Sequence, residues 1–370
     1  MKAYNWGSCL VLSLFILHIL AHQSEAATSY TIQDLGVGDA VSAAGPNLSG
    51  QAVVRSGFGS ARSSLITPNS SATSDVVSTP NSSATPGVAF SSNVTTDSLG
   101  LLSRGNHTTA NALNDSGTVV ASANGPTSVR PVIWTKTGAL QDLGTLSGDN
   151  AGEAFGINNA GAVVGYSAGP QGIRAFLWTP RDGMQRLSTL PGGSFSKAFG
   201  ISDNGLVVGS SGSSSGTRAV LWRLGSIQDL GSLPSGTTNE AFGVNNQGSV
   251  VGYSLGPAGD RAFLWTAEKG MRALDPLGGG FFSRALAIND KGDVVGVSGT
   301  FQNARAVLWN AQGTVQDLNV LVSLPPGLVL SEAVGINARG QIVALARDER
   351  DTHLFHEGFN RVFLLTPSGQ

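Results

Sequence analysis

The chain has 370 residues, of which 41% are apolar and 12% are charged, and its formal net charge is −2. This composition is typical of an ordered globular protein and excludes a disordered chain. The charges are single and scattered, with no cluster of Lys and Arg, so we predict no nucleic-acid partner and no anionic membrane surface. Fifty glycines and the lack of a long helical pattern favour many short strands joined by tight turns.

Residues 1–26 are predicted to be a secretory signal peptide. Lys2 supplies a positive start, and an apolar run of twelve residues extends from Cys9 to Leu20. This run is too short for a membrane-spanning helix, which needs about 20 residues, and no later segment is long enough. We expect cleavage near Ala27, no transmembrane segment in the mature chain and an extracellular or periplasmic location; an uncleaved membrane anchor is the alternative. Cys9 is the only cysteine, so the mature chain has no disulfide.

A pattern Ile-Asn-x-x-Gly-x-Val-Val recurs seven times, with variations, from residue 46 to the C-terminal part of the chain. Its glycines are Gly50, Gly117, Gly161, Gly205, Gly248, Gly292 and Gly340. Three residues earlier stand Asn47, Asn114, Asn158, Ser202, Asn245, Asn289 and Asn337. An Asn side chain bonds to the backbone of its own turn, and Gly accepts the positive φ that closes the turn. The pattern therefore predicts a β-hairpin in each unit.

A third strand is predicted after each hairpin, because an Arg is followed by apolar residues and, in five units, by Trp. The tryptophans are Trp134, Trp178, Trp222, Trp265 and Trp309, which are 44, 44, 43 and 44 residues apart. Beyond the Arg both faces of this strand are apolar, which indicates burial on both sides. We interpret the tryptophans as packing between neighbouring units and not as a binding surface.

A fourth short strand completes several units, as in Leu140 to Leu143, Ile227 to Leu230 and Val315 to Leu318. Ile32 to Leu35, near the start of the mature chain, has the same pattern. Four strands in about 44 residues, repeated seven times, predict an all-β fold, a β-propeller of seven four-stranded blades. An open β-solenoid is the alternative, but a closed ring is favoured because the chain begins on one member of the four-strand set and ends on another.

The single predicted domain spans residues 27–370, and its terminal units depart from the pattern. In the first unit, Arg62 to Thr67 occupy the third-strand position, and a Ser/Thr/Pro/Asn-rich insertion at 68–96 is predicted to be flexible. In the last unit, spacing places His353 to Phe355 in the third strand, whereas composition favours Arg361 to Leu365. Both possibilities are left open, and with them the way in which the ring closes.

The motifs Ala-Phe-Gly-Ile-Asn-x-x-Gly-x-Val-Val-Gly, Arg-Ala-Phe-Leu-Trp, Asp-Leu-Gly-Thr-Leu and the C-terminal Phe-Leu-Leu-Thr-Pro recur in order along the chain. In this respect the chain resembles the HAF-type extracellular repeat proteins, from Tyr30 to Pro367. The resemblance implies an exported repeat protein with a propeller fold. It implies no catalytic residue, because the function of that family is poorly defined.

No catalytic, cofactor-binding or metal-binding residue is predicted. Two Gly-x-Ser-x-Gly sequences, around Ser167 and Ser254, match the nucleophile elbow of α/β-hydrolases, but each leaves a predicted strand without a following helix. His353 and His356 would point to opposite sides of a strand and have no cluster of further ligands. The glycine-rich runs lack the Lys-Ser/Thr of a phosphate-binding loop.

The repeated arginines of the third strand recur with aspartates of the fourth strand. The arginines are Arg130, Arg174, Arg218, Arg261 and Arg305, and the aspartates are Asp142, Asp229 and Asp317. Packing requires the same charge in every unit more often than ligand binding does, so we predict structural ion pairs or bonds from Arg to the backbone. A ring of arginines that binds an acidic polymer is the alternative.

The sequence favours a monomeric, non-catalytic recognition or structural scaffold whose ligand is an extracellular glycan or protein. The repeats fix its framework, and the variation is confined to the connections. Phe195, Phe281 and Phe282, in the connections between units, are predicted to be exposed and to face the ligand. The alternative is an extracellular polysaccharide-degrading enzyme, a lyase or hydrolase, with a site on the ring axis. Its nearest acids are Asp149, Glu153, Glu240 and Glu332, but three of them recur at one repeat position, which argues for a structural or rim role.

Overall fold

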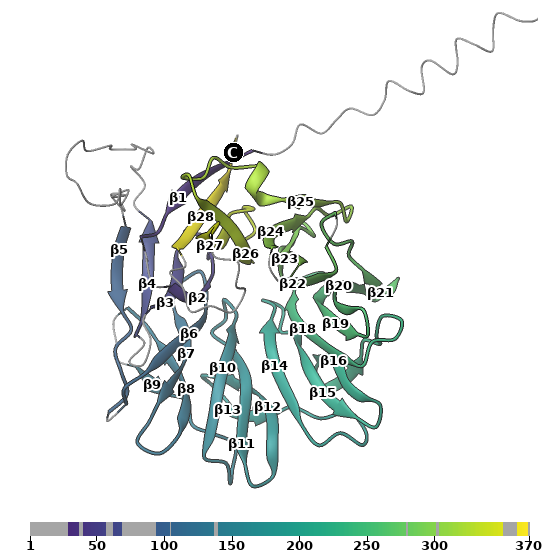
Figure 1. Ribbon diagram of the computed structural model, residues 1–370. Helices are drawn as coiled ribbons and strands as arrows, with labels where there is room; N and C mark the ends of the chain where they lie inside the picture. The colour runs from purple at the N-terminus through teal and green to yellow at the C-terminus, as the bar shows by residue number, and fades with distance from the viewer. Residues whose placement is uncertain are drawn as a thin grey trace, which may run out of the picture.

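The computed structural model describes residues 29–36, 40–56, 62–68, 94–103, 105–136, 140–278, 280–300, 303–350 and 361–368. These residues form 28 β-strands and a single 3-10 turn, η1 (Leu318–Val320). The strands group into seven antiparallel sheets of four, two of which are joined by the parallel pair Thr217↔Thr238. The sheets stand as blades around a central axis, so the predicted seven-bladed β-propeller is confirmed and the solenoid is excluded (Figure 1).

Each blade is built from an inner, a second, a third and an outer strand. The inner strands are β2 (Ala40–Ala44), β6 (Thr108–Leu113), β10 (Ala151–Ile157), β14 (Ser196–Ile201), β18 (Thr238–Val244), β22 (Phe282–Ile288) and β26 (Leu328–Ile336). The second strands are β3 (Ala52–Ser56), β7 (Val119–Asn124), β11 (Val163–Gly169), β15 (Val207–Ser213), β19 (Val250–Gly256), β23 (Val294–Thr300) and β27 (Ile342–Asp348). We number the blades 1 to 7 in the order of their inner strands, which contact one another around the axis.

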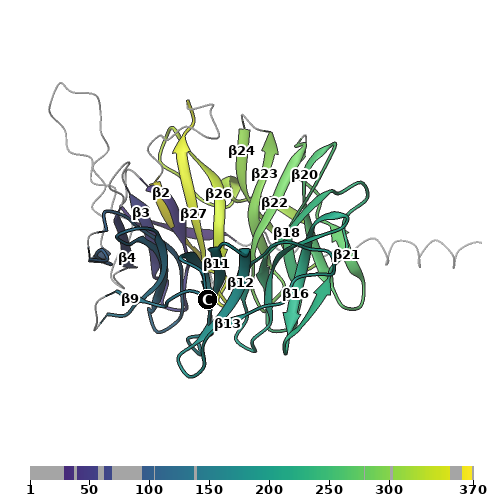
Figure 2. The same ribbon diagram turned by 90° about the horizontal axis from the view of Figure 1, so that it is seen from below.

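The third strands are β4 (Arg62–Pro68), β8 (Val129–Trp134), β12 (Gly172–Thr179), β16 (Gly216–Arg223), β20 (Gly259–Thr266), β24 (Asn303–Trp309) and β28 (Arg361–Pro367). The outer strands of blades 1 to 6 are β5 (Val94–Ser98), β9 (Gln141–Asp142), β13 (Gly183–Arg186), β17 (Ser226–Asp229), β21 (Gly270–Ala273) and β25 (Val315–Asp317). Figure 2 shows the disc from the side, with strands running between its two faces. The Asn-x-x-Gly turns lie on one face, the turn face. The loops from second to third strands and the connections between blades lie on the other, the connection face.

The N-terminal strand closes the ring. β1 (Tyr30–Asp34) pairs antiparallel with β28 and is the outer strand of blade 7. Composition was therefore the better guide to the last third strand, which is Arg361–Pro367, and His353 to Phe355 lie outside the described residues. The insertion predicted at 68–96 is shorter than expected at both ends, because Pro68 ends β4 and Val94 begins β5. The rest of it, and the predicted signal peptide, lie outside the described residues.

The tryptophans lie between blades, as predicted. Trp134, Trp222, Trp265 and Trp309 are buried, and Trp178 is half-buried. Trp222 of blade 4, for example, packs with Val164 and Leu187 of blade 3. Its indole Nε1 donates to the carbonyl of Ser188 in the connection between these blades, at 2.9 Å. Each tryptophan thus seals one blade against the preceding one.

Every Asn-x-x-Gly turn adopts the predicted form. The seven turn glycines have φ between 73° and 87°, a backbone region that L side chains resist. In the turn of blade 3, the Asn158 side chain accepts from the Ala162 amide at 2.9 Å, and Gly161 N donates to the Asn158 carbonyl at 3.0 Å. The asparagines are buried, so these polar groups need internal partners.

The asparagines also join the blades in a circle that the sequence did not predict. The Nδ2 of each donates to the carbonyl of the equivalent residue in the next blade, for instance Asn158 to Ser202 at 3.1 Å. Asn337 of blade 7 donates to the Asn47 carbonyl of blade 1 at 2.8 Å, which closes the circle. Ser202 has no side-chain amide. In its turn, Asn204 Nδ2 donates instead to the Asn246 carbonyl of the next blade at 2.7 Å. These turns surround a polar cavity of about 410 Å³ on the turn face.

Replacing Asn158 by Ala is expected to lower the free energy of unfolding by about 1–3 kcal/mol, because the Ser202 carbonyl and the Ala162 amide lose a buried partner. Urea unfolding measures the change. Asn159→Ala serves as the control, because it removes exposed hydrogen bonds to Asp115 and Asp203 of the neighbouring blades, and it should lose clearly less since water can replace exposed partners. Equal losses in the two variants would contradict a structural role for the buried circle.

Neighbouring blades are also matched at a second position. Ser196, at the start of inner strand β14, accepts from the Ala175 amide of blade 3 at 3.0 Å. Ser283 of blade 6 accepts from Ala262 of blade 5 in the same way, also at 3.0 Å. Between blades 2 and 3 the corresponding residues are Pro131 and Gly152. Pro131 has no N–H to donate and Gly152 has no hydroxyl to accept, so no polar group is left without a partner at this position.

Candidate functional site

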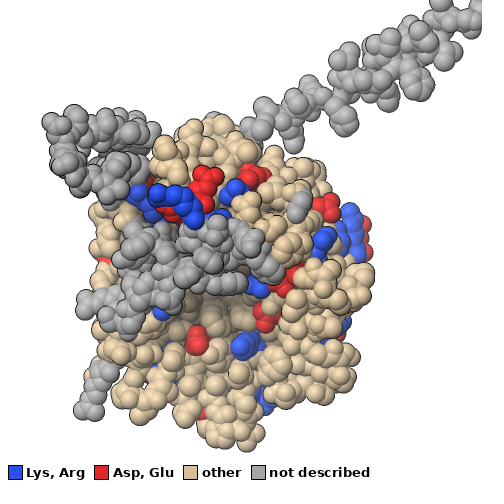
Figure 3. All heavy atoms as spheres, in the orientation of Figure 1, with Lys and Arg blue, Asp and Glu red and all other residues tan. Residues whose placement is uncertain are grey.

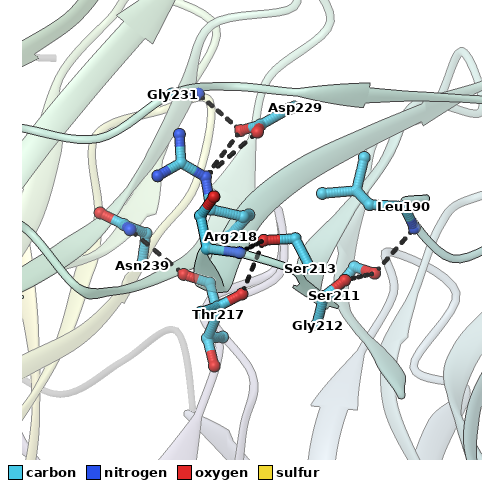
Figure 4. Close-up of polar contacts among 11 residues, drawn as sticks. Leu190, Ser211, Gly212, Ser213, Thr217, Arg218, Asp229, Gly231 and Asn239 are labelled. Atoms are coloured by element: carbon cyan, nitrogen blue, oxygen red, sulfur yellow. Dashed lines mark hydrogen bonds and ion pairs between the residues drawn. The ribbon is translucent and has the colours of Figure 1, made fainter. Parts of the chain in front are cut away.

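The predicted ion pairs between third and outer strands are present. Arg130 Nε lies 2.9 Å from Asp142 Oδ2 in blade 2, and Arg218 Nε lies 3.1 Å from Asp229 Oδ2 in blade 4 (Figure 4). Arg305 and Asp317 approach to 4.0 Å. Asp229 also accepts from the Gly231 amide at 2.8 Å, which fixes the turn after the outer strand. Such half-exposed pairs each contribute about 0.2–1 kcal/mol, so they support the scaffold and do not form a ring of free arginines.

Blade 3 uses a different carboxylate. Its outer strand carries Arg186 at the position of the aspartates, and Arg174 pairs with Asp149 from the connection before the blade. The Asp149 side chain is fully buried, and its second oxygen accepts from Ser167 Oγ at 2.7 Å. Asp149, which sequence reasoning placed among possible axial acids, is therefore part of the scaffold.

The serines of the two Gly-x-Ser-x-Gly sequences lie in strands and are buried. Ser167 belongs to β11, and its hydroxyl accepts from the Leu146 amide of the connecting segment at 3.0 Å. The equivalent Ser211 accepts from Leu190 at 3.0 Å in the same manner (Figure 4). Each second strand continues into a short loop and a further strand, without the helix that a nucleophile elbow requires. The interpretation of these sequences as repeat structure agrees with this geometry.

The aromatic residues predicted to face a ligand differ in exposure. Phe281 is 43% exposed on the connection face, as expected. Phe282 is 5% exposed and packs with Val297 and Ala304, so the prediction that it is exposed was wrong. It is the first residue of β22, where alternation turns its ring into the blade interior. Phe195 is half-buried. Whether Phe281 or Phe195 contacts a ligand stays a prediction.

Charged side chains of alternating sign line the axis on the connection face. They occupy one repeat position, directly before the central Ala of five consecutive inner strands, and we call them the axial ring. The axial ring consists of Glu153, Lys197, Glu240, Arg284 and Glu332. Arg284 is exposed and Glu153, Lys197 and Glu240 are half-buried, although they belong to the innermost strands. The Glu332 carboxyl is buried. Figure 3 shows single acidic and basic side chains close together near the middle of one face.

Two tyrosines of the second strands hold the acids of the ring. The Tyr166 hydroxyl donates to Glu153 Oε1 at 2.5 Å, and Lys197 Nζ lies 5.3 Å from the Tyr166 ring centroid. Tyr253 repeats the arrangement, because it donates to Glu240 Oε2 at 3.2 Å and its ring lies 4.7 Å from the Arg284 guanidinium carbon. Each tyrosine therefore binds the acid of its own blade and the cation of the next.

The environment keeps both phenols protonated. Burial, followed by the charge of Glu240, raises the pKa of Tyr253 to about 12. Burial and the hydrogen bond to Glu153 likewise raise the pKa of Tyr166 well above its usual value. Burial also raises the pKa of the Glu332 carboxyl, and the positive charge of Arg284 only partly opposes this.

An arc of aromatic side chains lies beside the charges. Phe155, Phe199 and Phe242 follow the axial ring by two residues in three consecutive blades, with ring centroids 5.5 and 5.4 Å apart. Their rings also contact Tyr166 at 5.8 Å and Tyr253 at 5.7 Å. All three phenylalanines are half-buried, so the arc adds an apolar wall to a charged surface. Binding sites for small molecules and sugars combine such walls with a few fixed polar groups.

Sequence reasoning found only part of this site. It noted that Glu153, Glu240 and Glu332 share one repeat position but missed Lys197 and Arg284, which occupy the same position in the intervening blades. A comparison of charge sign along that position would have shown the alternation. His107 contacts Thr109 Oγ1 at 2.7 Å, while His353 and His356 lie outside the described residues. Within the described ranges no three His, Cys, Asp or Glu side chains gather closely enough to hold a metal ion.

Comparison with known proteins supports the fold. No family model matches the chain, and no curated protein matches its sequence. Among solved structures, the β-propeller domain of the Trilobed protease from Pyrococcus furiosus is similar, with a TM-score of 0.50 at 9% identity over 92% of this chain and 96% of that one. Virginiamycin B lyase from Staphylococcus aureus gives a TM-score of 0.46 at 12% identity, covering 92% of this chain and 94% of that one. The SapL1 lectin in complex with alpha methyl fucoside gives 0.41 at 11% identity, covering 79% and 99%.

At 9% identity, the likeness to the Trilobed protease domain shows the β-propeller fold and nothing finer. The described residues include no helix of the length and apolarity that crossing a membrane requires.

Proposed function

We propose that the protein is an exported, monomeric recognition scaffold of the HAF type that binds an extracellular glycan at the axial ring. The observation that carries the proposal is the alternation of Glu153, Lys197, Glu240, Arg284 and Glu332 beside an aromatic arc. Carboxylates accept hydrogen bonds from sugar hydroxyls and cations donate to them, while aromatic walls contact the apolar faces of sugar rings. The predicted signal peptide supports export.

The partners of the ring support binding and not covalent chemistry. Glu153 and Glu240 are each held by a tyrosine hydroxyl, and Arg284 Nε donates to Asp260 at 2.5 Å. These bonds fix the orientation of the polar groups before a ligand arrives, which lowers the entropic cost of binding. The serine hydroxyls that could act as nucleophiles are committed to the scaffold or buried within it.

Replacing Lys197 by Ala is expected to weaken glycan binding about tenfold, because a charge-assisted hydrogen bond to the ligand is lost. Ligands are first found on a glycan array with the protein lacking residues 1–26, and affinities are then measured by isothermal titration calorimetry. Lys136→Ala, at an exposed lysine away from the ring, is the matched control and should bind like the unaltered protein. Unchanged affinity of Lys197→Ala for every glycan retained on the array would refute binding at the ring.

A polysaccharide-degrading activity is the second candidate, and the raised pKa of Glu332 is the observation that favours it. A carboxyl whose pKa is raised is the kind of group that serves as a general acid in such reactions. Incubation of the same glycans with the protein distinguishes the two functions. Release of oligosaccharides that disappears in Glu332→Gln would establish the enzyme, whereas binding without release supports the scaffold.

A further inference from the structure

One arginine of the repeated third-strand set stands alone. Arg261 of β20 forms no ion pair within the part of the chain that the structure describes. In blade 4 the residue opposite Val220 is Asp229, which binds the arginine, whereas in blade 5 the residue opposite Phe263 is Ala273. Blade 5 has therefore lost the usual carboxylate partner of this arginine.

Blade 3 shows how a carboxylate binds when the outer strand does not supply one. Ser167 and Arg174 face each other across β11 and β12. The Asp149 carboxylate lies between them, accepting from Ser167 Oγ at 2.7 Å and pairing with Arg174. Its side chain is fully buried there. In blade 3 a serine and an arginine in this register thus both contact one buried carboxylate.

Blade 5 repeats this arrangement without the aspartate. Ser254 and Arg261 face each other across β19 and β20 in the same register. Gly236 takes the place of Asp149, and both lie in the same turn, because each amide donates to the carbonyl of a leucine three residues earlier at 2.9 Å. A Cβ added to Gly236 would lie only 2.2 Å from Ser254 Oγ, so the serine hydroxyl points at the place from which the aspartate side chain would emerge.

Two buried polar atoms at this place lack partners. Ser254 is 2% exposed and Asn239 is 0% exposed, yet among the described residues Ser254 Oγ and Asn239 Oδ1 have no hydrogen-bond partner. The Asn239 amide nitrogen is occupied, since it donates to the Thr217 carbonyl at 3.2 Å (Figure 4). A buried polar group without a hydrogen-bond partner raises the free energy of the folded protein. A ligand that supplies the missing hydrogen bond removes this cost, which favours its binding. Ser235 and Thr237 on either side of Gly236 are exposed, so the turn that carries Gly236 lies at the surface of the connection face.

We propose that blade 5 holds a binding site for a hydroxycarboxylate, with the carboxylate bound between Ser254 and Arg261 where Gly236 replaces the aspartate of blade 3. Ser254 Oγ and the Arg261 guanidinium donate to the carboxylate, as Ser167 and Arg174 do to Asp149. Asn239 Oδ1 accepts only, so it selects a ligand whose hydroxyl, next to the carboxylate, donates to it. A free hydroxy acid and a uronate residue of a polysaccharide both carry this chemistry.

Isothermal titration calorimetry with glucuronate tests the site in the chain lacking residues 1–26. We expect saturable binding of glucuronate and about tenfold weaker binding of its methyl ester, which lacks the charge. Glycolate binding with similar affinity would assign the site to small free hydroxy acids, and binding of glucuronate alone would assign it to uronates. Equal binding of the ester and the acid would overturn the proposal.

Three variants place the binding in blade 5. Arg261→Gln is expected to weaken glucuronate binding about tenfold, and Gly236→Asp to abolish it by supplying the carboxylate from the chain itself. Arg218→Gln is the matched control, because that arginine already binds Asp229, and it should bind glucuronate normally. Unchanged binding in Arg261→Gln would overturn the proposal even if Gly236→Asp does not fold. Retained binding in Lys197→Ala would separate this site from the axial ring, so the two proposals fail independently.

Discussion

Replacing Trp309 by Ala is expected to lower the free energy of unfolding by about 3–5 kcal/mol, because a fully buried side chain leaves a cavity between two blades. Trp309 is 0% exposed and packs with Val251, Leu264 and Leu274 of the preceding blade. Its Nε1 also donates to the Asp275 carbonyl at 2.7 Å, a bond that alanine cannot make. The loss therefore combines packing with an unsatisfied backbone group.

Urea unfolding monitored by circular dichroism measures this loss, and Trp178→Ala provides the comparison within the same chain. Trp178 occupies the equivalent position but is half-buried. Its replacement should be clearly less destabilising, because less apolar area returns to water. A Trp178→Ala variant as unstable as Trp309→Ala would contradict the view that burial between blades sets the energy.

Deleting Tyr30 to Leu35 is expected to destabilise the whole ring by several kcal/mol. These residues supply the outer strand of blade 7, and Leu35, 1% exposed, packs with Val343, Val362 and Leu364. Its amide donates to the Val362 carbonyl at 2.9 Å. Without the strand, the edge of β28 and part of this cluster face water, and burial of Leu35 alone accounts for about 1.5–3 kcal/mol.

Thermal unfolding of two shortened chains tests this closure. A chain that lacks only residues 1–28 keeps β1 and serves as the control. The chain that begins after Leu35 should melt at a lower temperature and regain stability when a peptide with the sequence of residues 29–36 is added. Equal melting temperatures of the two chains would mean that the N-terminal strand does not hold the ring together.

The repeat made most of this fold predictable from the sequence. Glycine at the end of each turn and tryptophan at the end of each third strand are local signals, since one residue type meets one conformational or packing need. Because the units are copies, seven weak signals at fixed spacing combine into a strong one. The ion pair between Arg218 and Asp229 was predictable for the same reason.

Features that break the repeat were not predictable in this way. Asp149 replaces the outer-strand partner of Arg174. It lies before the first strand of its blade, so the repeat spacing gives no reason to pair it with Arg174 in the third strand. The last third strand was ambiguous because β28 begins only at Arg361 although β27 ends at Asp348, a longer separation than the spacing of the other units implies. The axial ring escaped notice because its members alternate in charge, whereas the search for repeated chemistry compared identical residues.

The matched pairs of Ser or Gly in one blade with Ala or Pro in the preceding one distinguish the boundary between blades 2 and 3 from the boundaries between blades 3 and 4 and between blades 5 and 6. A copy of blade 3 inserted after itself would place Gly152 opposite Ala175, whose buried amide would then have no acceptor. Rotating the start of the chain around the ring would preserve every neighbour, whereas exchanging blades 3 and 4 would place Ser196 opposite Pro131, which has no N–H to donate. The seven blades share one sequence pattern, but the residues at their boundaries make the order of blades 2, 3 and 4 a condition for satisfying buried polar groups.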